Sequence, residues 1–207
     1  MRDVFGRRKR QSQEPVDSAP GWDALERRVR DVLPGATQAQ HWGTDTLPGQ
    51  GGVYGISAFR SGETWLYLTF GLSELFAKES DDLEVSGWGF ELTMRVPRSG
   101  DTPPTWPVTT LSKLGRYVLT SGTPFEAGHR IGGGGFTDDP TSRLDGLAFA
   151  VDPELWSVDT PNGRVTFLAA VGVTADELEL MRSTTSAAVL EGLKQAMPLL
   201  VTDPARR

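Results

Sequence analysis

Residues 90–96 alternate between apolar and polar side chains, and this alternation constrains the fold more than any other feature of the sequence. The run reads Phe90, Glu91, Leu92, Thr93, Met94, Arg95 and Val96. Successive side chains of a β-strand point to opposite faces of its sheet. The run therefore predicts a strand with one face buried in a core and the other in contact with solvent.

Other segments predict further strands. Residues 53–59 and 64–70 are two extended runs joined by four residues that include Gly62, which is typical of a β-hairpin. Extended apolar runs also occupy residues 147–151 and 165–173, and a short run at residues 199–202 predicts a final strand. Residues 128–143, rich in glycine, are expected to form a long irregular loop.

Apolar side chains recur at helical spacing in several segments, and we expect the helices at residues 22–32, 107–118, 174–181 and 187–197. Pro34 and Gly122 would end the first two. Thr174 and Glu177 have the spacing of a capping box. The sequence thus predicts an α+β fold, with helices packed on a mixed, largely antiparallel β-sheet.

The chain has 207 residues, of which 38% are hydrophobic, enough to fill the core of one domain. We expect a disordered basic tail at residues 1–20, with a cluster at residues 7–10, and one domain at residues 21–207. The net charge is −6, and the tail contributes +2 to it, so the domain carries −8. An acidic domain without a basic stripe argues against nucleic acid as a partner.

The chain has no cysteine, so it has no disulfides and no zinc site built on thiolates. No apolar run approaches the ~20 residues of a membrane span, and the first residues lack the apolar stretch of a secretory signal. We therefore expect a cytoplasmic protein that makes no contact with membranes.

The sequence shows no constellation for catalysis, a metal or a cofactor. The two histidines, His41 and His129, lack the spacing of metal ligands, and no serine lies in a G-x-S-x-G motif. The glycines at residues 132–135 are not followed by the Lys-Ser or Lys-Thr of a phosphate-binding loop. We expect a protein that is not an enzyme and binds no metal or cofactor.

One alternative is a hydrolase or nucleotide-handling enzyme that uses the glycine-rich loop 128–143. His129 and Arg130, with Asp138 or Asp139, would be its reactive groups, because long loops often carry function. A third hypothesis is an adaptor recruited through the basic tail.

Several segments, taken in order along the chain, resemble the suppressor-of-fused domain, which is known from a signalling regulator in animals and from bacterial single-domain proteins. They are residues 71–75 (GLSEL), 87–95 (GWGFELTMR), 103–107 (PPTWP), 114–118 (LGRYV), 142–144 (SRL), 160–163 (TPNG), 165–168 (VTFL), 171–174 (VGVT), 177–178 (EL) and 200–203 (LVTD). Each block alone is unspecific. Their order and spacing from Trp22 to Asp203 carry the resemblance.

The resemblance implies a mixed sheet with helices that binds other proteins and catalyses no reaction. The animal member grips an extended peptide between two lobes, and this chain is too short for the second lobe. A tyrosine and an acid border the groove there. Tyr117 matches the tyrosine, whereas the place of the acid holds His129 or Gly128.

The candidate partner-binding residues are Tyr117, Phe125, His129 and Trp106. The alternative for Tyr117 is a helix residue that covers the core. The resemblance implies that the partner is a protein. It would be a toxin that this chain neutralises as an immunity protein, a protein that it sequesters, or an extended peptide. An acidic face would speed association with a basic toxin by electrostatic steering.

Overall fold

The computed structural model describes residues 18–43 and 52–206. The strands are β1 (Thr37–Gly43), β2 (Gly55–Ser61), β3 (Thr64–Phe70), β4 (Val85–Pro97), β5 (Arg130–Gly132), β6 (Leu144–Val151), β7 (Ser157–Thr160) and β8 (Gly163–Thr174). The helices are α1 (Pro20–Val32), α2 (Trp106–Ser121), α3 (Ala175–Ser183) and α4 (Ser186–Ala196). Most of the predicted tail, residues 1–17, lies outside the described residues.

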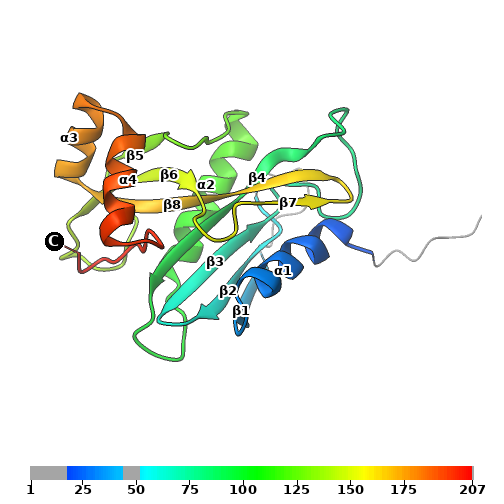
Figure 1. Ribbon diagram of the computed structural model, residues 1–207, viewed down its shortest axis with the longest axis horizontal. Coiled ribbons are helices and arrows are strands. Elements are labelled where there is room, and N and C mark those ends of the chain that lie inside the picture. Colours follow the sequence, from blue (N-terminus) through cyan, green and yellow to red (C-terminus); the bar gives the residue numbers. More distant parts are fainter. Residues whose placement is uncertain (1–17, 44–51, 207) are drawn as a thin grey trace, which may run out of the picture.

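All the described strands belong to one sheet, in the order β1-β2-β3-β4-β8-β6-β5, and β7 pairs with β8 beside this path. The central pair, β4 and β8, is parallel, whereas the other neighbours are antiparallel. Figure 1 shows the helices packed against this sheet. The predicted α+β fold with a mixed, largely antiparallel sheet is therefore confirmed.

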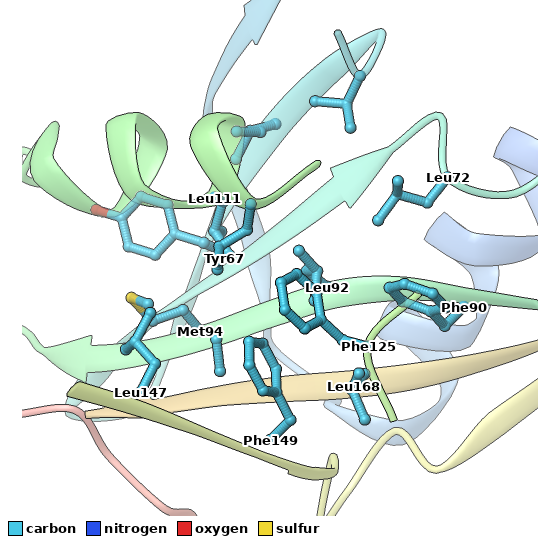
Figure 2. Close-up of a cluster of buried hydrophobic side chains, with 14 of the residues drawn as sticks. Tyr67, Leu72, Phe90, Leu92, Met94, Leu111, Phe125, Leu147, Phe149 and Leu168 are labelled. Carbon is cyan, nitrogen blue, oxygen red and sulfur yellow. The ribbon is translucent and has the colours of Figure 1, made fainter. Parts of the chain in front are cut away.

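The helices cover both faces of the sheet. One face packs against α2, and the cluster between them includes Tyr67, Leu92, Leu111 and Phe149 (Figure 2). The opposite face is covered by α1 over β2, β3 and β8, and by α3 and α4 over β6 and β8. The sheet is thus the middle layer of three (Figure 1).

The prediction that one face of residues 90–96 is solvated was wrong, because Glu91, Thr93 and Arg95 are all buried. The segment that follows β6 brings Asp152 onto Thr93 and Arg95. Its carboxylate lies 2.5 Å from the guanidinium of Arg95 and accepts a hydrogen bond from Thr93 Oγ1. Glu91 instead accepts hydrogen bonds from Thr69 Oγ1 and Ser73 Oγ. The polar side chains of the strand are thus all held in buried hydrogen bonds, which an alternating sequence does not distinguish from a solvated face.

The predicted helices, their capping and the first hairpin are confirmed. Gly122 ends α2 in the left-handed conformation, and Thr174 with Glu177 forms the capping box of α3. Residues 199–202 are not a strand. Instead, Thr202 is joined to two strands by hydrogen bonds. Its N–H donates to Arg95 O of β4, and its Oγ1 accepts from Gly172 N of β8.

Two strands, β1 and β7, were not predicted from the sequence, and a third strand, β5, lies inside a predicted loop. The side chains of β1 are nearly all exposed and those of β7 only partly buried, so neither carries a clear apolar pattern. The loop predicted at 128–143 contains β5, whose three residues are exposed. Within residues 18–43 and 52–206, no helix has the length and apolar character that a membrane span requires.

Candidate functional site

A groove lies where the sheet ends at β5. It has a volume of about 400 Å³ and is open to solvent. The residues that line it come from α2, from the segment after that helix and from β5: Tyr117, Thr123, Pro124, Phe125, Gly128, His129, Arg130 and Ile131. Three of the four predicted partner-binding residues thus lie together at this groove.

Three aromatic rings run from the groove into the core. Tyr117 on α2 is 47% exposed, and its ring stacks on that of Phe125 with centroids 5.5 Å apart. Phe125 in turn stacks on Phe149 of β6 at 4.3 Å, and Figure 2 shows this pair within the buried cluster. Because two of the three rings are buried, they fix the position of the exposed one.

Backbone hydrogen bonds align β5 on β6. Phe149 N donates to His129 O at 2.9 Å, and Gly133 N donates to Asp145 O at 3.0 Å. The two bonds lie at the two ends of the short strand. In an antiparallel pair, residues alternate between those whose backbone groups face the partner strand and those whose groups face away.

This alternation places Ile131, which pairs with Leu147, toward β6. The backbone N–H and C=O groups of Arg130 and Gly132 therefore point to the other side. Since β5 is the last strand of the sheet, that side has no neighbouring strand among the described residues. The groove is thus bordered by the exposed ring of Tyr117 and by β5 at Arg130, whose outward backbone groups meet no further strand in the described part of the chain.

Glycines bring β5 close to its neighbours. Gly132 pairs with Gly146 of β6. A Cβ atom at Gly146 would lie 2.4 Å from Ile131 O and 2.7 Å from Cδ1 of Leu178 on α3. Only glycine fits at this contact, so residue 146 determines how β5 is held.

The polar side chains at the groove have defined partners. His129 Nδ1 accepts a hydrogen bond from Glu126 N at 3.2 Å, and its side chain remains half exposed. The guanidinium of Arg130 donates to Ser186 Oγ at the start of α4, at 3.1 Å. Thus Arg130 ties β5 to the last helix, while His129 lies at the surface of the groove.

The structure does not bring Trp106 to the groove. It is only 7% exposed and packs in the cluster beneath α2. As the first residue of that helix, followed by Pro107, it is turned into the core, so it supports the fold and offers no contact surface. Ile131 was missed as a candidate, although it is 37% exposed and lines the groove, because a lone apolar residue among glycines gives no strand pattern.

The residues of the alternative catalytic hypothesis are held by other partners. Arg130 bonds Ser186, and the carboxylate of Asp139 accepts from Thr141 N and Thr141 Oγ1. No hydrogen bond joins His129 to Asp138 or Asp139 in the described part of the chain. Nor do the described residues contain a group of three or more histidine and acidic side chains that could hold a metal ion.

Comparisons with known proteins agree with this fold. The family model for the suppressor of fused protein matches residues 52–207. The human suppressor of fused homolog is 36% identical over 155 residues, which cover 70% of this chain and 32% of the human protein. The chain thus spans about a third of the length of that relative.

Solved structures are also similar. A chain in the crystal structure of the Sufu-Fu complex superimposes with a TM-score of 0.83 at 30% identity, over 92% of each chain. A suppressor of fused homolog from Neisseria gonorrhoeae superimposes with a TM-score of 0.62 over 90% of this chain and 95% of that one, and at 14% identity it shows the fold alone. The chain belongs to the suppressor of fused family.

Proposed function

We propose that this chain is a non-enzymatic protein-binding module that takes an extended segment of a partner protein onto the open edge of β5. The single observation that carries the proposal is the groove itself. An exposed Tyr117 ring, supported by two buried rings, lines the same groove as Arg130 and Ile131 of β5, which is the last strand of the described sheet.

Each border of the groove has its own role in binding. An added strand would exchange backbone hydrogen bonds with Arg130 and Gly132, which gives affinity without regard to sequence. Side chains of the added strand that point toward α2 would pack on Tyr117, a type of residue that often anchors interfaces. The side chains at the groove would then select among segments.

The comparison with the Sufu-Fu complex supports protein binding as the class of function, since that structure contains a similar chain in a complex. The chain spans about a third of the human relative, so the proposal concerns only the contact that this domain makes.

The finer proposal concerns the partner. We propose that this chain acts in the cytoplasm as an immunity protein that neutralises a toxin, or as a regulator that sequesters its partner. The net charge of −6 supports a basic partner such as a nuclease-like toxin, because opposite charges speed association. Co-expression with a toxin encoded nearby tests the immunity version, which fails if the toxin still kills.

An affinity pull-down from the native cell tests the binding module. The full chain is compared with Tyr117→Ala and with Leu180→Ala, a control that removes an exposed apolar side chain on α3. We expect a stoichiometric partner with the wild type and the control, and reduced capture with Tyr117→Ala. Equal capture by all three would contradict the assignment of the groove.

The same purified protein tests the catalytic alternative. A broad screen for hydrolase and nucleotide-processing activity should give no signal that depends on His129. An activity that disappears in His129→Ala would contradict the non-enzymatic proposal.

A further inference from the structure

A second pocket, separate from the groove at β5, lies beside the segment that joins β3 to β4. Its volume is about 520 Å³. Apolar and aromatic side chains from three parts of the chain line it, namely Tyr54, Leu72, Phe76, Trp88 and Leu119. Phe76 is 47% exposed and Trp88 is 37% exposed. Exposed aromatic side chains gathered around a pocket are typical of an interaction site.

The wall of this pocket is held in place by the buried carboxylate of Glu91. Glu91 Oε1 accepts hydrogen bonds from the backbone N–H groups of Gly71, Leu72 and Ser73 at 2.8, 3.1 and 2.9 Å. Trp88 N donates to Leu72 O, which fixes the backbone on the other side. The pocket is therefore built by a fixed segment of the chain.

A second carboxylate, Glu74, orders the next part of the wall. Burial raises its pKa, but hydrogen bonds from Lys78 and from the backbone of Glu79 and Ser80 outweigh burial and lower the pKa to about 2. The ammonium group of Lys78 lies 2.8 Å from Glu74 Oε2, so this cation is already paired.

The segment around the pocket is strongly acidic. After Glu74 and Lys78 pair, the remaining charged side chains of residues 74–84 are four exposed acids: Glu79, Asp81, Asp82 and Glu84. Of these four, Glu79 lines the pocket, and the other three follow it in the exposed segment that we call the acidic rim, residues 79–84. The pocket thus has an apolar floor beside an acidic segment. It suits a segment that carries one apolar side chain next to several cations.

This chain contains such a segment. Val4 and Phe5 are followed by Arg7, Arg8, Lys9 and Arg10, so the segment joins an apolar pair to a cluster opposite in charge to the acidic rim. The segment lies outside the described residues, and the first of these is Ser18.

The described chain begins at the wall of the pocket. Gly21 N, at the start of α1, donates to Leu75 O at 2.9 Å, and Leu75 lines the pocket. A Cβ atom at Gly21 would lie 2.3 Å from Glu74 O, so the helix and the wall are in direct backbone contact. Since an extended chain spans up to about 3.5 Å per residue, the residues between Phe5 and Ser18 are long enough to reach any part of the pocket.

We propose that residues 4–10 of this chain dock in this pocket, with Phe5 between Tyr54, Phe76 and Trp88, and with Arg7–Arg10 on the acidic rim. The contact is intramolecular, so its effective concentration is high and a modest affinity suffices.

The experiment uses the full chain. Because the chain has no cysteine, Gln11→Cys provides a single site for a nitroxide spin label. The label broadens the NMR signals of nearby amides, and these are recorded for residues 71–89 in dilute protein. Phe5→Ala and the reversal of Arg8 and Lys9 to Glu are made in the same labelled chain, and Val16→Ala is the matched control in the same tail.

We expect the label to broaden the signals of Phe76 and Trp88, and we expect this broadening to be lost in Phe5→Ala and in the charge reversal but kept in Val16→Ala. Placing Glu79→Lys and Asp81→Lys in the charge-reversed chain should restore it. Broadening that is the same in all tail variants would overturn the proposal. Broadening that grows with protein concentration would also overturn it, since the occupant would then be a second copy.

Discussion

The ring of Tyr117 lies 5.5 Å from the ring of Phe125, stacked on it and exposed to solvent on its other side. Replacing Tyr117 with Ala removes the exposed ring and leaves the buried pair of Phe125 and Phe149 in place. We expect binding of the partner captured by the full chain to weaken about tenfold, as for the loss of an aromatic anchor. The free energy of unfolding should fall by less than about 1 kcal/mol.

Isothermal titration calorimetry measures the affinity for the partner, and urea unfolding measures the free energy of unfolding. Tyr117→Phe keeps the stacked ring and should bind nearly as the wild type does. A large loss of stability in Tyr117→Ala would support the alternative, in which this side chain covers the core.

Gly146→Ala tests how β5 is held. The new methyl group would lie 2.4 Å from Ile131 O, so β5 must move away from β6. We expect both a lower midpoint of thermal unfolding and weaker binding of the partner. Gly192→Ala on α4, where the added Cβ meets no neighbour within 4 Å, is the control. It should leave binding unchanged and should not lower the midpoint, since alanine favours a helix more than glycine does. Unchanged binding of the partner by Gly146→Ala would contradict the proposal that the partner binds at β5.

The buried pair of Arg95 and Asp152 stabilises the centre of the sheet. In Asp152→Asn the guanidinium loses the negative charge of its buried partner, and the free energy of unfolding should fall by about 3 kcal/mol. The exposed pair of Asp159 and Arg164 is the matched control, and Asp159→Asn should leave stability unchanged within error. Equal effects of the two substitutions in urea unfolding would contradict the role of the buried pair.

Glu91 predicts a dependence of stability on pH. Burial raises its pKa from 4.5 to about 7, against hydrogen bonds from Thr69, Ser73 and Gly71 that lower it. The folded state therefore holds this proton more tightly than the unfolded state does. The contribution of Glu91 to the free energy of unfolding is fully present below pH 4.5. It decreases as the pH rises to about 7, by up to about 3 kcal/mol.

Urea unfolding between pH 4.5 and 7 measures this slope. Glu91→Gln keeps a side-chain oxygen for the backbone N–H groups and cannot ionise, so the slope should flatten. Glu179→Gln, an exposed glutamate on α3, should retain it. The slope cannot be assigned to Glu91 if the Glu91→Gln variant keeps the dependence of the wild type.

The sequence predicted the helices and strands that have a local signal, such as a regular spacing of apolar residues or a capping motif. The apolar stripe of α1, the hairpin of β2 and β3, and the capping box of α3 all follow from local residue spacing. The network around Asp152 could not be predicted, because its members lie 57 and 59 residues apart and meet only when the sheet forms.

The candidate site was predicted in part, and through the family resemblance. Tyr117, Phe125 and His129 do meet at one groove, but nothing in the sequence shows that Phe125 and Phe149 stack beneath the tyrosine. β5 has only three residues and ends in glycine, so its free edge became visible only in the assembled sheet. Trp106 was chosen as a large aromatic residue, and residue type alone does not tell an exposed ring from a buried one.

Amide hydrogen exchange with and without a bound segment tests the central claim most directly. The probe is a twelve-residue peptide selected from a random library against the full chain and rejected by Tyr117→Ala. We predict that the amides of Arg130 and Gly132 exchange rapidly in the free protein and become protected when the peptide binds, whereas Ile131 and Gly133 are protected in both states. Binding that leaves the exchange of Arg130 and Gly132 unchanged would contradict the addition of a strand at β5.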